Sequence, residues 1–327
     1  MGFRREPTFL LLSEEIDRYS WKGVWLFFAT YFGAFLVAAV IGPIIYVWIQ
    51  NMPPSPDPDS LLVYLQSKHL SRYMDRVRLI GVAISLVWLI RWCGLWGRFG
   101  FNWSRGGFSF LWKFLVLGVA SMVLVVITQA LLTDVGQEGA FSAGRLLERS
   151  FSALMGGLLL GWLEEAIFRG MLFRMFYTAT KPLAAIILSS LVFAAVHFKH
   201  VPAELGEPVT WYSGFIVAGY QSVAVFFEVR WLEFLNLVLV GMVLILVFMR
   251  TRNLVACMGL HAGWVLVRNV WSKLFEIPEG GSAQFWGTDR IVDGYACTIM
   301  LAILLVVLYA NFRSHQGKGQ VSLGALA

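Results

Sequence analysis

The chain has 327 residues, of which 58% are hydrophobic and only 14% are charged. A soluble domain carries roughly 25% charged residues, so this composition excludes an ordinary water-soluble protein and fits a chain surrounded mostly by lipid. The formal charge of +6 does not indicate a nucleic-acid-binding protein, because the Lys and Arg residues are spread between apolar runs and form no single basic stripe. The lipid bilayer is therefore an expected partner, and nucleic acid is not.

A helix needs about 20 mostly apolar residues to cross a bilayer. Eight such runs predict an all-α fold, a polytopic transmembrane helix bundle with about eight spans. In chain order, the predicted spans are residues 23–48, 79–95, 110–132, 151–177, 181–198, 232–249, 254–271 and 293–312.

One further apolar stretch, residues 212–227, is short and contains Gly214, Gly219 and Gln221. We interpret it as a re-entrant or interfacial segment; the alternative is a ninth span, which would reverse every later helix. With eight spans, basic residues are in excess on the side that holds both termini, and the positive-inside rule makes this side cytoplasmic. The expected location is the plasma membrane, as a multi-pass integral protein.

The candidate chemistry lies in the middle of the chain. We therefore divide the sequence into an N-terminal three-span region (1–145), a catalytic four-span core (146–275) and a C-terminal span with a tail (276–327).

Ionisable side chains inside a bilayer are costly and usually functional. The fourth span contains Glu164, Glu165 and Arg169. Glu165 and Arg169 stand at i and i+4 on one helix face, in the favourable order, which predicts an ion pair that supports the structure. Glu164 points about 100° away and is expected to face a cavity as a general base. The alternative is that the three charges only hold helices together.

Small residues and histidines add to this pattern. Gly157 and Gly161 form a GxxxG step on the same span, which favours close packing against another helix. The fifth span ends with Phe193 and, four residues later, His197, while His261 lies near the middle of the seventh span. Two histidines on separate spans, together with a carboxylate-bearing span, predict a shared polar cavity.

These motifs together resemble the CPBP family, the intramembrane proteases related to CAAX prenyl endopeptidases and to bacteriocin-processing or immunity proteins of the Abi group. That family shows EExxxR, then FxxxH, then a histidine with Asn or Asp four residues later, each on a separate helix. The corresponding residues here are Glu164-Glu165-xxx-Arg169, Phe193-xxx-His197 and His261, within residues 150–272.

The resemblance implies that Glu164 activates the attacking water with help from His197, and that His261 belongs to the oxyanion site. Val265 departs from the family pattern, because it stands where the family usually has Asn or Asp. Valine cannot donate a hydrogen bond, and the loss of one oxyanion donor can cost about 2.7–4 kcal/mol. The candidate substitutes for the missing donor are Trp264, Arg268 and Asn269, of which Arg268 is best placed on the His261 face.

The sequence thus predicts an intramembrane endopeptidase that uses glutamate-activated water, without a cofactor, on membrane-associated or lipidated peptide substrates. A zinc-dependent version with Glu164, His197 and His261 as ligands is one alternative, although the usual HExxH helix is absent. A catalytically weak or inactive scaffold or immunity protein, binding a client in the same cavity, is a second and is favoured by Val265. A proton-coupled transporter is a third, against which the chain shows no paired half-structures.

Overall fold

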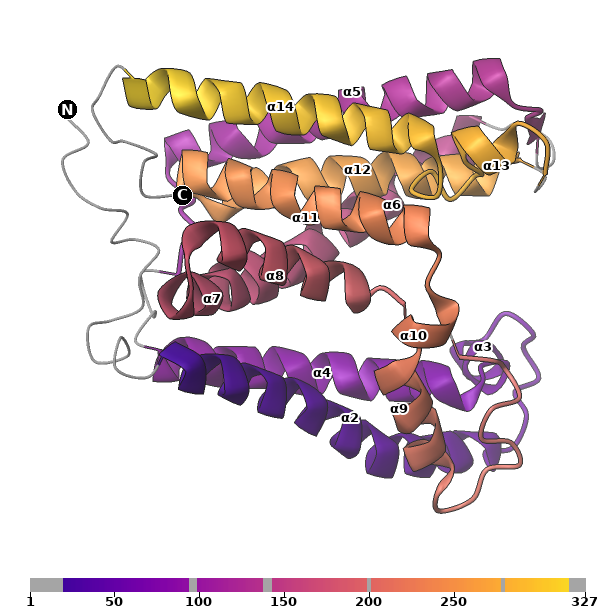
Figure 1. The fold of residues 1–327 in the computed structure, drawn as a ribbon. Helices are drawn as coiled ribbons and strands as arrows, with labels where there is room; N and C mark the ends of the chain where they lie inside the picture. Colours follow the sequence, from indigo (N-terminus) through magenta and orange to yellow (C-terminus); the bar gives the residue numbers. More distant parts are fainter. Residues whose placement is uncertain (1–19, 94–98, 138–142, 199–200, 278–279, 318–327) are drawn as a thin grey trace. The chain divides into compact units, whose positions relative to one another are not determined.

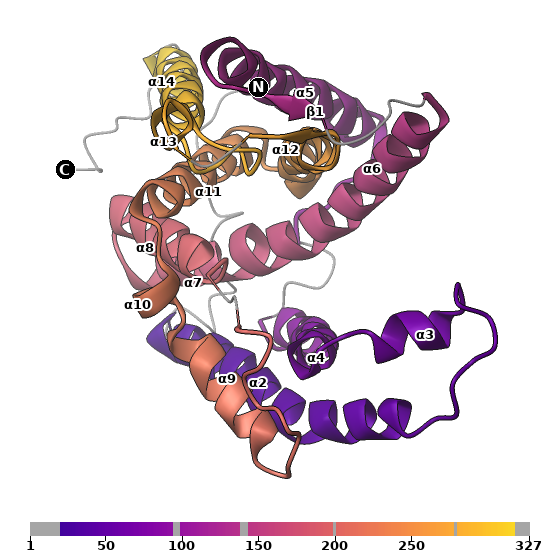
Figure 2. The same cartoon turned by 90° about the vertical axis from the view of Figure 1, so that its right-hand side faces the viewer.

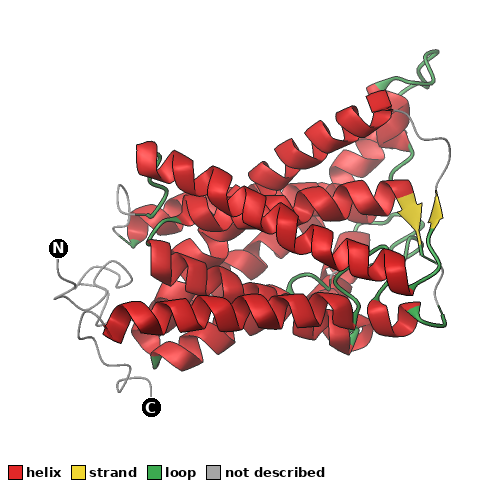
Figure 3. Ribbon diagram, turned by 90° about the horizontal axis from the view of Figure 1, so that it is seen from above, coloured by secondary structure: helices red, strands yellow, loops and turns green. Residues whose placement is uncertain are grey.

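The computed structural model describes residues 20–93, 99–137, 143–198, 201–277 and 280–317, and this part of the chain is almost entirely helical (Figure 3). Packing divides the chain into two compact units that are interleaved in sequence. Among the described residues, the first unit comprises 20–21, 93, 99–137, 143–194, 230–277 and 280–317, and the second comprises 22–92, 195–198 and 201–229.

The first unit holds most of the helices (Figure 1) and a small strand pair (Figure 3). Its helices are α5 (Arg105–Leu132), α6 (Ala143–Glu165), the π-helix η1 (Ala166–Leu172), α7 (Phe173–Ala179), α8 (Pro182–Ala195), α11 (Trp231–Thr251), α12 (Leu254–Leu274), α13 (Ala283–Trp286) and α14 (Tyr295–Gly317). Strands β1 (Gly136–Gln137) and β2 (Phe275–Glu276) pair antiparallel, with Gly136 opposite Glu276. The second unit is built from α2 (Ser20–Gln50), α3 (Leu61–Gln66), α4 (Leu70–Trp92), α9 (Ser213–Val223) and α10 (Val225–Glu228).

Each of the eight predicted spans corresponds to a helix, which confirms an all-α membrane helix bundle. Within the described residues, five helices are long and apolar enough to cross a membrane: α2, α5, the continuous helix through α6, η1 and α7, α11, and α12. The apolar parts of α8 and α14 are shorter. Helix α4 begins at Leu70, well before the predicted residue 79, because charged residues such as Asp75 and Arg78 lower the hydropathy of its first half without breaking the helix.

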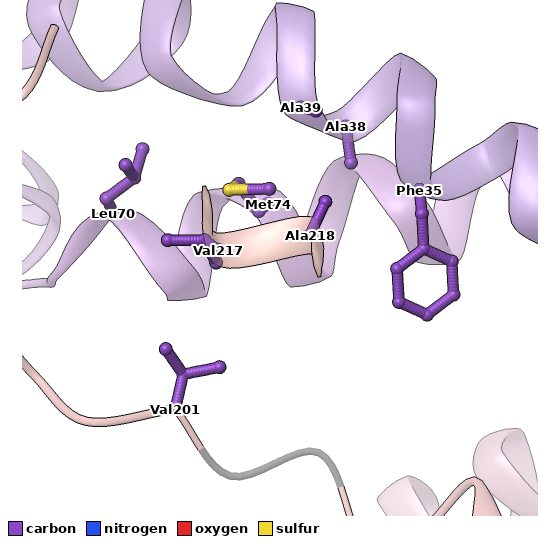
Figure 4. Close-up of a cluster of buried hydrophobic side chains, with 8 residues drawn as sticks. All are labelled: Phe35, Ala38, Ala39, Leu70, Met74, Val201, Val217 and Ala218. Carbon is purple, nitrogen blue, oxygen red and sulfur yellow. The ribbon is translucent and has the colours of Figure 1, made fainter. Parts of the chain in front are cut away.

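The second unit packs α9 against α2 and α4 around a small apolar core (Figure 4). Pro43 has no N–H, so the carbonyl of Ala39 in α2 lacks its usual intrahelical donor. Gly214 at the start of α9 lies directly against this carbonyl, since a Cβ at position 214 would be only 1.9 Å from the Ala39 oxygen. Glycine is therefore needed at this crossing.

Helix α9 covers most of the short apolar stretch that followed the fifth predicted span. It has 11 residues, which is too short for a bilayer crossing of about 20 residues, and this length favours the re-entrant or interfacial interpretation. A polar cluster fixes α9 to α4: Arg78 donates to Gln221 at 3.1 Å and to Asp75 at 2.8 Å, and Gln221 donates to Asp75 at 3.1 Å. Because each of these groups has a partner, the buried Arg78 is compensated.

Helix α12 occupies the centre of the first unit, where it packs against α5, α6 and α11 (Figure 2). Glycines make these contacts possible on two faces. A Cβ on Gly263 would lie 2.5 Å from the Leu115 carbonyl of α5, and a Cβ on Gly161 would lie 3.3 Å from the Met258 carbonyl of α12. The GxxxG step of α6 therefore faces α12, as close helix packing requires.

A buried asparagine fixes the segment before α14 to α11. The Asn236 amide donates to the carbonyls of Val292 and Gly294 at 2.8 and 3.1 Å, and its oxygen accepts from Thr298 Oγ1 at 2.8 Å. Since Asn236 is fully buried, these bonds replace its lost hydration.

Candidate active site

The EExxxR motif lies where α6 changes into a π-helix. Helix α6 ends at Glu165, and η1 follows over Ala166–Leu172 with all of its residues buried. The wider hydrogen-bond spacing is seen at Phe173, whose N–H donates to the carbonyl of Phe168 five residues earlier. Single π-helical turns inside α-helices frequently mark functional sites, because they change the direction of side chains relative to the flanking α-helices.

Glu165 and Arg169 form the ion pair that their spacing predicts. Arg169 Nη1 lies 2.9 Å from Glu165 Oε1, and both side chains are essentially fully buried. The same Glu165 oxygen also lies 2.9 Å from Nδ1 of His261 in α12. Glu165 therefore joins the guanidinium of η1 to the imidazole of α12, a contact that the sequence analysis did not anticipate.

Two further contacts hold the Arg169 guanidinium. Its Nη2 donates to the carbonyl of Gly241 in α11 at 3.4 Å, and its Cζ stands 4.4 Å from the centroid of the Phe193 ring. Phe193 also packs edge-on against Phe168 at 5.0 Å between ring centroids. The phenylalanine of the FxxxH motif thus supports the arginine of the EExxxR motif through a cation–π contact.

Glu164 stands on the other side of the His261 ring from Glu165. Its Oε2 lies 3.8 Å from His261 Nε2, and 17% of its side-chain surface is exposed, whereas that of Glu165 is fully buried. A separation of 3.8 Å is too long for a direct hydrogen bond. An oxygen atom about 2.8 Å from both groups would fit geometrically, since the two distances together exceed the separation.

His197 stands just beyond the end of α8. Helix α8 ends at Ala195, so His197 stands in the turn after the helix and not within it, and its side chain is exposed. The FxxxH motif crosses the boundary between the two units, because residue 194 belongs to the first and residue 195 to the second. Its cooperation with Glu164 stays a prediction from the family resemblance.

The position four residues after His261 faces α6. A Cβ on Gly157 would lie 3.3 Å from both Cβ and Cγ1 of Val265, so the valine fills the seam between α6 and α12. The buried Trp264 donates its indole N–H to Ser121 Oγ of α5 at 3.0 Å, so this candidate donor is engaged on a neighbouring helix.

The other two candidate donors lie farther along α12. Arg268 is exposed, and its Nη1 lies 3.4 Å from Oδ1 of Asn269. Burial raises the pKa of Asp289 in the segment before α14, while the positive charge of Arg268 acts in the opposite direction. Arg268 therefore lies close enough to Asp289 to act on it electrostatically.

Across residues 20–93, 99–137, 143–198, 201–277 and 280–317, no group of three or more His, Cys, Asp or Glu side chains is placed to hold a metal ion. The oxygen Oε1 of Glu165 is already shared by Arg169 and His261.

The comparisons with known proteins agree with the motifs. Residues 147–267 match the family model of the type II CAAX prenyl endopeptidases described as Rce1-like. Neither the curated proteins nor the solved structures gave a match. The matched segment contains all three motifs, so the comparison confirms the resemblance and supports an intramembrane protease at the level of the family.

Proposed function

We propose that this protein is an intramembrane endopeptidase that hydrolyses peptide bonds of membrane-associated or lipidated substrates by means of a water molecule activated by Glu164. The observation that carries the proposal is the Glu164 side chain, which is 17% exposed and whose Oε2 lies 3.8 Å from the His261 imidazole, inside helices apolar enough to span a membrane. Intramembrane ionisable groups are retained chiefly where function requires them.

In this reaction Glu164 accepts a proton from water, and the oxygen attacks the carbonyl carbon of the scissile peptide. The resulting tetrahedral intermediate carries a negative oxygen, for which His261 is the nearest candidate donor on α12. Collapse of the intermediate breaks the C–N bond, and the proton held by Glu164 passes to the leaving amine. The family resemblance assigns His197 to the same water molecule.

The expected setting is a multi-pass protein of the plasma membrane with both termini in the cytoplasm. The substrate is a peptide or protein that reaches the site from the membrane, and the reaction as written needs no cofactor.

The test is cleavage of candidate membrane peptides by purified protein, read by mass spectrometry. Glu164→Gln should lower the rate about 10²–10⁴-fold, because it removes the general base while preserving shape. Glu233→Gln is the matched control, since Glu233 is a partly buried carboxylate of α11 that pairs with Arg230. Full activity of Glu164→Gln would refute the assignment.

Treatment with a chelator distinguishes the metal-free mechanism from the zinc-dependent alternative. Metal analysis of the purified protein and activity after chelation should show no metal requirement if Glu164 acts on water alone. Loss of activity on chelation, restored by zinc, would instead support the zinc-dependent alternative, in which Glu164, His197 and His261 are the expected ligands.

A second candidate function is the binding of a peptide client without cleavage. Val265 favours it, because this valine packs against Gly157 and offers no hydrogen-bond donor near His261. A peptide that is retained intact by the wild-type protein and by Glu164→Gln alike would support this function over hydrolysis.

A further inference from the structure

We propose that Glu165 is a positioning residue that fixes the tautomer of His261, so that Nε2 is the ring nitrogen presented toward Glu164. The role of this tautomer in hydrolysis rests on the proposed function, whereas the tautomer itself can be measured without any assay of activity.

The first step of the argument is the chemistry of the shared oxygen. Glu165 Oε1 lies 2.9 Å from Arg169 Nη1 and 2.9 Å from His261 Nδ1. A guanidinium only donates, so this oxygen acts as an acceptor, and the hydrogen of its contact with His261 sits on Nδ1. A partner that binds one ring nitrogen in this way determines which nitrogen of a neutral imidazole carries the proton.

Burial makes this assignment persistent. Glu165 and Arg169 are 0% and 1% exposed, and His261 is 6% exposed. Water therefore has little access to compete for Nδ1. Phe193 further limits the movement of both partners, because its ring lies 4.4 Å from the Arg169 guanidinium carbon and 6.4 Å from the His261 ring centroid.

The second step concerns the opposite edge of the ring. With Nδ1 bound to Glu165, Nε2 is the nitrogen that faces Glu164, at 3.8 Å from its Oε2. In the neutral ring Nε2 is an acceptor, so it can stabilise an oxyanion only after taking up a second proton. The groups around the ring are two carboxylates, Glu164 and Glu165, and one cation, Arg169. A second proton on His261 adds one positive charge, so the four groups together are then neutral.

Glu165 is thus more than the counter-ion of Arg169. Its carboxylate connects a cation in η1 to an imidazole in α12, and it leaves the Nε2 edge of that imidazole for the substrate. In serine proteases, a carboxylate behind the histidine likewise orients the ring and stabilises the imidazolium that forms, and Glu165 would in the same way favour the protonated His261 that can donate from Nε2.

The experiment uses full-length protein labelled with ¹⁵N-histidine in detergent micelles or nanodiscs. NMR distinguishes protonated from unprotonated ring nitrogens, and His261→Asn identifies the signals of His261 by their disappearance. We expect the proton at Nδ1 in the wild-type protein. A neutral His261 with its proton at Nε2 would overturn the proposal, whatever the activity.

Variants then test whether Glu165 is the cause. Glu165→Met/Arg169→Met removes the acceptor together with its cation, so no uncompensated charge stays buried, and it should abolish the preference for Nδ1. An unchanged tautomer in this variant would contradict the role of Glu165. Glu233→Gln, which removes a carboxylate from the same unit, should leave the His261 signals unchanged and is the matched control.

Kinetics connect the tautomer to the reaction. Glu165→Gln should lower kcat about 10²–10⁴-fold with little change in KM, because the ring is misoriented while the substrate contacts remain. If the same fall in kcat/KM came from a higher KM alone, with kcat unchanged, Glu165 would not act by positioning His261. If Glu164→Gln stays active while wild-type His261 carries its proton at Nδ1, the proposed function fails and the positioning role of Glu165 stands.

Discussion

Replacing Arg169 by methionine removes the cation beside Glu165 while keeping an unbranched side chain in the same space. The wild-type guanidinium makes a charge-assisted hydrogen bond to Glu165 at 2.9 Å and a cation–π contact with Phe193 at 4.4 Å. Such a hydrogen bond contributes about 1.5–3 kcal/mol, and a desolvated cation–π contact contributes about 2 kcal/mol. The sum agrees with the cost of about 3–5 kcal/mol for removing one partner of a buried ion pair.

The free energy of unfolding of Arg169→Met should therefore fall by about 3–5 kcal/mol. It can be measured by titration with sodium dodecyl sulfate in mixed micelles, followed by circular dichroism. Glu165→Gln/Arg169→Met should recover much of the loss, because no carboxylate is then left buried without its cation. Arg250→Met, at an exposed position of α11, should change the stability by less than about 0.5 kcal/mol. A loss below about 1 kcal/mol for Arg169→Met would refute the view that Arg169 compensates a buried charge.

Three further substitutions test the packing of the first unit and the position that departs from the family pattern. Gly263→Val should destabilise the protein by about 1–3 kcal/mol or more, because its Cβ would lie 2.5 Å from the Leu115 carbonyl, whereas Gly156→Ala, with open space around it, should be neutral in the same titration. Asn236→Leu should lower the free energy of unfolding by about 2–4 kcal/mol, because it removes three hydrogen bonds to the segment before α14 and to the first turn of α14. No change in stability would mean that water already binds these groups in the wild-type protein. Val265→Asn should raise kcat for peptide cleavage about 10²-fold if position 265 supplies an oxyanion donor; an unchanged kcat would place that donor elsewhere.

Much of the fold follows from patterns within single helices. Hydropathy located every predicted span on a helix, although it placed the start of α4 too late because Asp75 and Arg78 are charged yet helical. The i, i+4 spacing of Glu165 and Arg169 predicted their ion pair correctly, and the GxxxG step predicted close packing of α6. These features depend on the geometry of one continuous helix, which covalent connectivity fixes.

No sequence pattern of this kind predicted the contacts between different helices. The hydrogen bond between His261 and Glu165 joins α12 and α6, and the bond from Trp264 to Ser121 joins α12 and α5. Apolar side chains pack equally favourably against lipid and against another helix, so the hydropathy of a span indicates neither its neighbours nor its rotation about its own axis. The fifth span also continued in apolar residues past Ala195, and only the fold showed that the helix ends before His197.

The sequence by itself determined that this protein is a helical membrane protein, and it singled out Glu164, Glu165 and Arg169 in the fourth span, although it gave no role to Arg174, which is also buried there. It did so because lipid excludes unpaired polar groups and makes each exception visible. Only the tertiary structure decided that one oxygen of Glu165 serves both Arg169 and His261, because that contact depends on how two helices far apart in the chain are rotated toward each other.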